Sequence, residues 1–132
     1  MAVINPDNPG DDVLAFLGEY HLASLTIVKE NGEPHVTAVG FTYEPERRLA
    51  RVITWADSWK AKHVARMGTA NAAICTVDGG RWLTFSGTAS LAQTPEAIAE
   101  GVRRYAARYR PPKERDDRVV IELSVDKIVG RA

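Results

Sequence analysis

The sequence lacks most features that mark a specialised structural class. Its 132 residues contain a single cysteine, Cys75, so no disulfide forms within one chain, and no Cys/His cluster has zinc-site spacing. The N-terminal segment has no apolar stretch typical of a signal peptide, and no apolar run approaches the roughly 20 residues that span a bilayer. We therefore expect a single cytoplasmic domain over residues 1–132, with neither a metal nor a membrane partner.

The chain also has no excess charge of either sign, since its formal net charge is zero. Seventeen Lys and Arg residues balance 17 Asp and Glu residues, and this balance argues against nucleic acid as a partner. The charge is nevertheless uneven, because residues 58–77 contain no acid and residues 101–113 are strongly basic. Two local basic segments on a neutral chain favour a discrete anionic ligand. For the second segment, a solvated helix face is an equally good interpretation.

The usual residues of catalysis are also missing. The chain has no Gly-x-Ser-x-Gly motif, and Cys75 lies in the middle of an apolar run. The three histidines, His21, His35 and His63, are not paired at ligand spacing. No two carboxylates share an apolar element, as general acid/base catalysis by a carboxylate pair requires. No residue is therefore assigned as catalytic, and a protein of this kind can take its chemistry from a bound cofactor.

The remaining pattern predicts a mainly β protein with small helices. Asn31-Gly32 and Gly79-Gly80 are typical of hairpin turns, and no alternation of strand and helix indicates a parallel sheet. We expect six or seven strands in an antiparallel barrel, bent at Gly87, with an irregular arm over 1–10 and a tail over 126–132. The expected strands are 21–29, 34–43, 48–55, 72–77, 81–92 and 118–125, and the expected helices begin near residues 11, 58 and 95.

The most informative stretch lies where the strand ending at Trp55 meets the second helix. Asp57 or Ser58 can cap that helix by accepting a backbone N–H. Lys60 and Lys62 then fall near its first turn, where positive charge opposes the helix dipole. The same charges suit an anion bound at the free N–H groups, so the stretch predicts either a phosphate site or an ordinary basic helix face.

Aromatic residues and one arginine accompany this stretch. Trp55 and Trp59 flank it, and Trp82 follows Arg81 after the Gly-Gly turn. These residues suit a flat conjugated ligand, but packing of the barrel ends explains the tryptophans equally well. Arg51 lies on an otherwise apolar strand face and needs a partner, which is either a phosphate or a neighbouring acid.

The order of these segments resembles a known family. Strand PHVTAVGFTYEPE, strand RLARVITWADS, the Ser-x-Lys helix start and the hairpin AAICTVDGGRWLTFSGTASL follow the order found in the split β-barrel flavin and deazaflavin oxidoreductases. That superfamily includes the pyridoxamine phosphate oxidases and the coenzyme F420-dependent reductases. The segment RRYAARYRPP followed by RVVIELSVDKIVG is most similar to the F420-dependent biliverdin reductases.

The resemblance implies a homodimer that binds F420, or alternatively FMN, at the subunit interface. It places the cofactor phosphate at Ser58 and Lys60, extended by Lys62 toward an anionic tail. It places the ring along residues 38–41 and 51–54. The cofactor-binding residues are then Ser58, Lys60, Lys62, Ala38, Val39, Gly40, Arg51, Ile53, Thr54, Trp55 and Trp82, and the substrate-binding residues are Arg81, Trp82, Phe41 and Trp59.

The activity implied by the resemblance is hydride transfer from reduced F420 to a conjugated tetrapyrrole, with biliverdin giving bilirubin. Arg81, Lys62 or the basic segment would meet its two propionates. The chain has no C-terminal arginine-containing substrate segment of the pyridoxamine phosphate oxidases, which argues against that activity. Three alternatives remain open: an FMN-dependent oxidoreductase, a non-catalytic carrier of F420, flavin or haem, and a structural β-barrel dimer.

Overall fold

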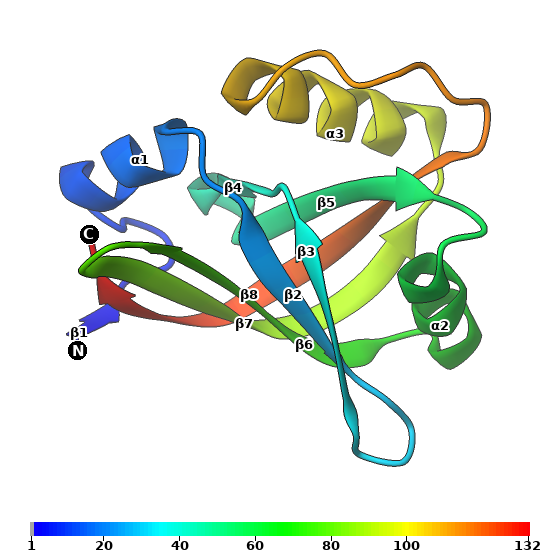
Figure 1. Ribbon diagram of the computed structural model, residues 1–132, viewed down its shortest axis with the longest axis horizontal. Coiled ribbons are helices and arrows are strands. Elements are labelled where there is room, and N and C mark those ends of the chain that lie inside the picture. The colour runs from blue at the N-terminus through cyan, green and yellow to red at the C-terminus, as the bar shows by residue number, and fades with distance from the viewer. Residues whose placement is uncertain (1) are drawn as a thin grey trace.

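The computed structural model describes residues 2–132, which form one antiparallel sheet with helices packed around it (Figure 1). The strands are β1 (Ala2–Ile4), β2 (Ala23–Val28), β3 (Pro34–Val39), β4 (Thr42–Glu44), β5 (Leu49–Trp55), β6 (Ala70–Asp78), β7 (Arg81–Ala92) and β8 (Arg118–Arg131). The helices are α1 (Asp11–Gly18), α2 (Trp59–Met67) and α3 (Pro95–Arg108), with a 3-10 turn at Pro45–Arg47.

The sheet curls into a barrel that is split at one seam. Its strand order is β3-β2-β6-β7-β8-β5-β4, and β1 pairs with β8. The two edge strands, β3 and β4, are nevertheless joined in the chain by Gly40 and Phe41 alone. The chain therefore crosses the seam without a hydrogen-bonded ladder between the two edges. The predicted split β-barrel is confirmed, but it has eight strands rather than six or seven, because β1 is added and the expected strand over 34–43 is divided into β3 and β4.

Alternation of side chains explains how the strands form the core. In β2, Ala23, Leu25 and Ile27 point inward and are buried, while the residues between them face outward. At Gly87 the register of β7 against β8 shifts by one residue. The backbones approach so closely here that only glycine fits, since a Cβ on residue 87 would lie 1.8 Å from the carbonyl oxygen of Ser124. The predicted bend at this glycine is confirmed.

The two chain ends differ from the prediction. The expected irregular arm contains β1, although Met1 lies outside the described residues. The expected tail is also wrong, because β8 continues to Arg131 and pairs with β7 over this length. The bulge accommodates Asp126, which has no partner on β7, and the pairing of β8 with β7 resumes at Lys127.

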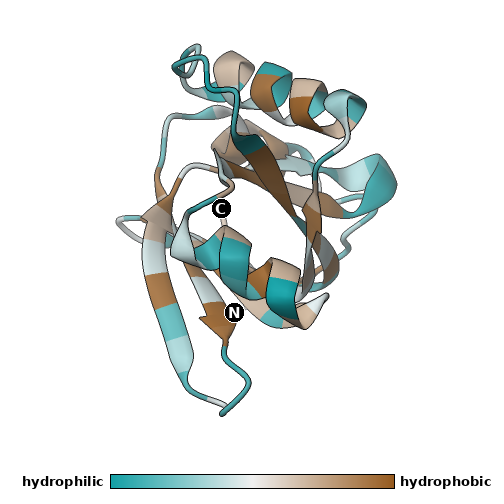
Figure 2. Ribbon diagram, turned by 90° about the vertical axis from the view of Figure 1, so that its right-hand side faces the viewer, coloured by the Kyte–Doolittle hydropathy of each residue, from teal (hydrophilic) through white to brown (hydrophobic). Residues whose placement is uncertain are grey.

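The helices cover the openings and one side of the barrel. The buried residues Val13, Phe16 and Leu17 of α1 cover one end, and α2 covers the other (Figure 1). Figure 2 shows apolar segments along the strands and mixed polarity on the helices. Within residues 2–132, no helix has the length and apolar character needed to cross a membrane. The cytoplasmic location stays a prediction.

Candidate functional site

The start of α2 is built to leave backbone donors free. Ser58 is its N-cap, and the Ser58 Oγ accepts a hydrogen bond from the Ala61 N–H at 3.2 Å. The Thr54 hydroxyl donates to the same oxygen at 2.9 Å and fixes the serine rotamer. Ser58 is thus the cap, rather than Asp57. The N–H groups of Trp59 and Lys60 precede any intrahelical acceptor, so they are available to an anion.

A cavity of about 220 Å³ opens beside this helix start. It lies between the end of β3, the end of β5, the first turn of α2 and the segment from α3 into β8. Seven sequence-predicted residues meet in its wall, which confirms that they lie together: Ala38, Val39, Gly40, Ile53, Thr54, Trp55 and Lys60.

Gly40 provides a flat part of the cavity wall. A Cβ at this position would lie 2.9 Å from a ring carbon of Tyr105 and 3.0 Å from one of Tyr109, so both rings rest on the bare backbone. Ala38, two residues earlier, adds only a methyl group. The missing side chain of Gly40 therefore makes room for the two tyrosine rings, and it is the small side chain of Ala38 that leaves space for a flat cofactor beside β3.

Lys60 supplies the positive charge of the cavity. Its amine is half-buried, and burial lowers the pKa of Lys60. It forms no ion pair with any carboxylate of residues 2–132, and its Nζ lies 5.4 Å from the centre of the Trp55 ring. A desolvated amine beside free N–H groups, without a protein counter-ion, fits the phosphate of a cofactor.

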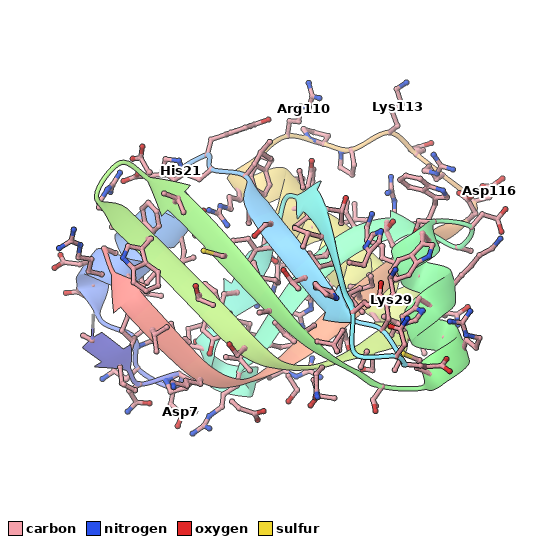
Figure 3. All side chains as sticks on the ribbon, turned by 60° about the horizontal axis from the view of Figure 1, so that its bottom comes forward. Asp7, His21, Lys29, Arg110, Lys113 and Asp116 are labelled. Atoms are coloured by element: carbon pink, nitrogen blue, oxygen red, sulfur yellow. The ribbon has the colours of Figure 1, made fainter. Side chains whose placement is uncertain are left out.

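The sequence did not reveal three residues of the wall, which are Tyr105, Pro112 and Arg118. The Arg118 Nη1 donates to the Thr54 carbonyl at 3.4 Å, and its Nη2 donates to the Lys113 carbonyl at 2.7 Å. Burial lowers the pKa of Arg118. The motif RYRPP indicated that this region matters, but only the β5–β8 pairing shows which arginine reaches the site. Figure 3 shows Lys113 pointing outward from the loop.

Two predicted residues lie in the interior and do not line the cavity. Arg51 is 3% exposed, and its Nη2 donates to the Glu44 carboxylate at 2.9 Å, so its partner is an acid. Phe41 is completely buried, and its ring packs against Phe85 at 5.3 Å between centres. The Phe41 side chain therefore cannot reach a substrate in this conformation, contrary to the expectation.

Two more lie on the outer side of α2. The Trp59 ring stacks against His35, with 3.7 Å between ring centres, and against His63, with 4.5 Å. Trp59 lines a different cavity from the one beside the start of α2. Lys62 is exposed and lies 3.9 Å from Asp57, outside the cavity wall.

Arg81 and Trp82 lie far from the cavity within one chain. Trp82 pairs with Arg131 at the end of β8, whereas Trp55 pairs with Arg118 at its start. Neither of these two predicted residues therefore reaches the cavity of its own chain.

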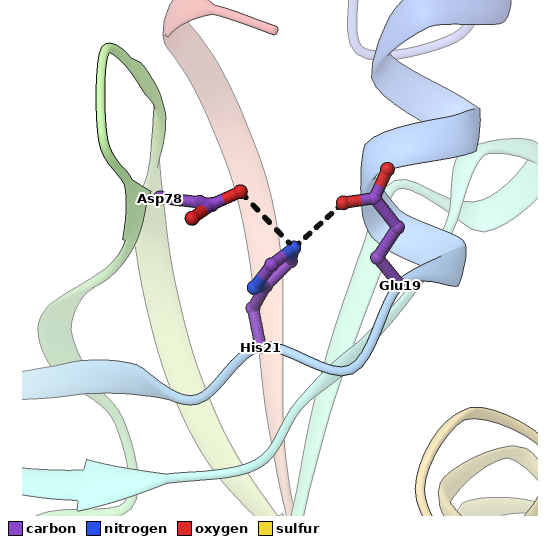
Figure 4. Close-up of side chains that lie close together, drawn as sticks. All are labelled: Glu19, His21 and Asp78. Carbon is purple, nitrogen blue, oxygen red and sulfur yellow. Dashed lines mark hydrogen bonds and ion pairs between the residues drawn. The ribbon is translucent and has the colours of Figure 1, made fainter.

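Arg81 belongs to an ion-pair cluster at its own end of the barrel. Its guanidinium donates to both Glu19 and Asp78, and the side chain of His21 lies between the two acids (Figure 4). The hydrogen bond from Arg81, followed by that from His21, lowers the pKa of Glu19 to about 2. The acceptor atoms of Glu19, His21 and Asp78 lie within 4.8 Å of one another, but the guanidinium already compensates their charge.

Comparison with known proteins agrees with this geometry. The profile of a family described as pyridoxamine 5'-phosphate oxidase matches residues 10–131. The chain is 44% identical, over 133 aligned positions, to an F420H(2)-dependent biliverdin reductase of Mycobacterium tuberculosis (strain CDC 1551 / Oshkosh), covering 100% of this chain and 96% of that protein.

Solved structures show the same fold. A conserved hypothetical protein of Mycobacterium tuberculosis superposes with a TM-score of 0.74 at 20% identity, covering 90% of this chain and 81% of the other. A protein described as an F420 reductase superposes with a TM-score of 0.67 at 20% identity, covering 87% and 94%. The profile and the full-length relative together establish that the chain belongs to the pyridoxamine 5'-phosphate oxidase family of split β-barrel proteins.

Proposed function

We propose that this protein is an F420H2-dependent reductase that converts biliverdin to bilirubin. The observation that carries the proposal is the full-length similarity, at 44% identity, to a relative described by that activity. The cavity beside α2 supports it, because the small Ala38 side chain on β3 and the desolvated lysine suit a flat, phosphate-bearing cofactor. Reduced F420 would supply the hydride, and the protein would supply alignment and charge.

The residues of the cavity divide this work between two ends. At one end, the free N–H groups of Trp59 and Lys60, together with the Lys60 amine, bind the phosphate. At the other end, the small Ala38 side chain lets the ring lie against β3. Tyr105 packs over Gly40 and limits the access of water to that side. Fixing both ends holds the reactive ring in one orientation, which is the main contribution that a site without its own nucleophile can make.

The proposal includes a homodimer, because one face of the sheet is uncovered and uncharged. On β3, β2, β6 and β7 the outward residues form two cross-strand rows, Ala38–Ser24–Cys75–Thr84 and Val36–Thr26–Ala73–Ser86. Val36 and Val77 on this face are 61% and 60% exposed. An exposed sheet face that spans four strands and carries no charge favours burial against a second copy.

This face also borders the cavity. Ala38 belongs both to the face and to the cavity wall, so a second copy covering the face would complete the site. Trp82 ends the same face, opposite Val77 on the neighbouring strand. A two-fold axis through the face would bring that end of one copy toward the cavity of the other, where a tryptophan and an arginine can meet the substrate.

The activity is tested by mixing the protein with reduced F420 and biliverdin under anaerobic conditions. We expect the biliverdin absorption to disappear and the bilirubin absorption to appear at a rate proportional to enzyme concentration. Reduced FMN, tested in parallel, should not replace F420. Bilirubin formed only with reduced FMN would support an FMN-dependent enzyme, and F420 binding without turnover would support a carrier; either result contradicts the proposal.

The dimer is tested by light scattering of the Ala73→Arg variant. Light scattering of the wild type should give twice the 14.5 kDa chain mass. The arginine added in the centre of the face should yield monomers, and these should bind F420 more weakly. Ala65→Arg is the matched control, since Ala65 is exposed on α2 away from this face. A monomeric wild type would refute the dimer.

A further inference from the structure

The chain crosses the seam of the barrel between β3 and β4 without a ladder. Gly40 and Phe41 make this crossing, and within residues 2–132 the two edge strands β3 and β4 are not paired with each other. Gly40 also lines the cofactor cavity, together with Ala38 on β3. Buried backbone groups that have no ladder need other hydrogen-bond partners. The partners of this crossing therefore decide how firmly the β3 wall of the cavity is held.

The end of α3 supplies those partners. Arg108 is the last residue of α3, and Tyr109 follows it. The Phe41 N–H donates to the Tyr109 Oη at 3.1 Å, and the Arg108 Nη1 donates to the Phe41 carbonyl at 2.6 Å. The Tyr109 hydroxyl in turn donates to the His21 carbonyl at 2.7 Å. The Arg108 Nε donates to the Glu19 carbonyl at 3.0 Å, so both side chains also hold the segment between α1 and β2. We call Arg108 and Tyr109 the seam clamp.

Burial prevents water from replacing the seam clamp. The Arg108 guanidinium carbon lies 4.8 Å from the centre of the Phe41 ring and 5.0 Å from the centre of the Tyr109 ring. Burial lowers the pKa of Arg108 and raises the pKa of Tyr109. Phe41 itself is completely buried. Loss of either clamp side chain would therefore leave buried backbone groups of the crossing without a partner, which is costly.

The middle of α3 packs on the opposite side of the seam. A Cβ on Gly101 would lie 2.9 Å from a methyl carbon of Val120 on β8 and 3.2 Å from one of Ile53 on β5. The glycine thus lets the helix approach these strands closely. Ile53 also lines the cofactor cavity. The helix therefore joins the two walls of that cavity, because its middle packs on β5 and β8 while its end holds the crossing that leaves β3.

We propose that Arg108 and Tyr109 are positioning residues for the ring of the cofactor. By holding the crossing, they keep Ala38 on β3 at a fixed distance from Ile53 on β5, and the ring lies between these two walls. Neither clamp residue lines the cavity, so both act through the backbone of the crossing. If the crossing is released, only a fraction of the molecules has the wall in place, and the apparent affinity falls by that fraction. The proposal rests on the proposed function, because it assumes that this cavity binds F420.

Two ligands separate the ring end of the site from its phosphate end. They are F420 and the phosphate-free deazariboflavin that carries the same ring, and both are titrated into the full chain and followed by quenching of tryptophan fluorescence. Tyr109→Phe keeps the aromatic ring against Gly40 but removes the hydroxyl, and it should weaken the binding of both ligands equally, by about fivefold or more. Arg108→Gln removes the donor to the Phe41 carbonyl and should have the same effect. Lys60→Ala should weaken the binding of F420 alone, because it acts at the phosphate.

Tyr43→Phe is the matched control for the loss of a tyrosine hydroxyl. Tyr43 is also buried, and its hydroxyl donates to the Pro6 carbonyl at 2.7 Å, away from the cofactor cavity. The thermal midpoint is measured for every variant. We expect it to fall in both Tyr43→Phe and Tyr109→Phe, whereas Tyr43→Phe should keep the wild-type affinity for both ligands.

Four outcomes would overturn this proposal alone. The first is an affinity of Tyr109→Phe for both ligands within about twofold of the wild type. The second is a loss of F420 affinity in that variant without a loss for deazariboflavin, and the third is an equal loss in Tyr43→Phe. The fourth is a wild type that binds F420 but not deazariboflavin, since the walls would then contribute no affinity for the ring. A wild type that binds neither ligand would overturn the proposed function as well, so the two failures are distinguishable.

Discussion

Trp55 and Arg118 lie directly opposite each other on β5 and β8, where the first strand ends and the second begins. This pairing brings the loop after α3 to the start of α2, so both contribute to one cavity. The Arg115 guanidinium carbon lies 5.0 Å from the Trp55 ring centre, and the Lys60 Nζ lies 5.4 Å from it. The tryptophan ring is thus surrounded by cations, which suits an anionic ligand better than a neutral one.

Replacing Lys60 with Ala should weaken F420 binding by about tenfold or more, because a charge-assisted hydrogen bond to the phosphate contributes about 1.5–3 kcal/mol. The measurement is a titration followed by quenching of tryptophan fluorescence. Lys62→Ala is the matched control, since Lys62 is exposed and lies outside the cavity wall. Equal losses in both variants would indicate general attraction of an anion rather than a site at Lys60.

Replacing Ser58 with Ala should lower the free energy of unfolding by about 1 kcal/mol, because the cap of α2 is lost. It should also weaken F420 binding, since the free N–H groups at the helix start lose their fixed position. Thr94→Ala is the control, because Thr94 caps α3 through the same hydrogen bond to Ala97. Urea unfolding should show the loss of a cap in both variants, with a larger loss in Ser58→Ala, because that change also leaves the buried Thr54 hydroxyl without its acceptor. A binding loss shared by Thr94→Ala would assign the effect to stability alone.

Local patterns in the sequence predict much of this fold. The hairpin signals, the strand alternation and the cap at Ser58 depend on residues close together in the chain, and the structure confirms them. The split barrel and the gathering of Ala38 and Lys60 followed from the resemblance to a family of known fold. The structure confirms that arrangement as well.

Features that depend on distant pairing could not be predicted. Arg118 reaches the cavity only because β8 lies beside β5, and Arg51 finds its acid on the paired neighbouring strand β4. The resemblance made Phe41 a ligand contact, but the crossing between β3 and β4 turns its side chain into the core. The resemblance had Arg81 approach the substrate from near the subunit interface, and the strand register adds that within one chain it lies at the opposite end of β8 from the cavity.

His35 should titrate below its ordinary pKa of 6.5, because burial lowers its pKa, as do Lys29, Lys60 and His63 to a smaller extent. The folded state then binds fewer protons than the unfolded state. The free energy of unfolding should therefore be constant above about pH 6.5 and fall as the pH drops through the lowered pKa. NMR titration of the imidazole protons gives the midpoint, and urea unfolding at pH 7.5 and 5.5 gives the stability. In His35→Gln this part of the pH dependence should vanish; a midpoint at or above 6.5 would contradict the prediction.

Replacing Glu44 with Gln should lower the free energy of unfolding by about 3 kcal/mol, because the buried Arg51 would keep its charge and lose its acid. The Arg51 side chain is 2% exposed and the Glu44 side chain is 14% exposed, so water cannot replace the carboxylate. Adding Arg51→Met to the same variant removes the stranded charge and should restore most of the loss, as replacement of a buried ion pair by a hydrophobe is often neutral. Glu46→Gln is the control, since Glu46 is exposed on the adjacent turn. Urea unfolding curves of the four proteins check this; a Glu44→Gln variant within about 0.5 kcal/mol of the wild type would show that the pair contributes little.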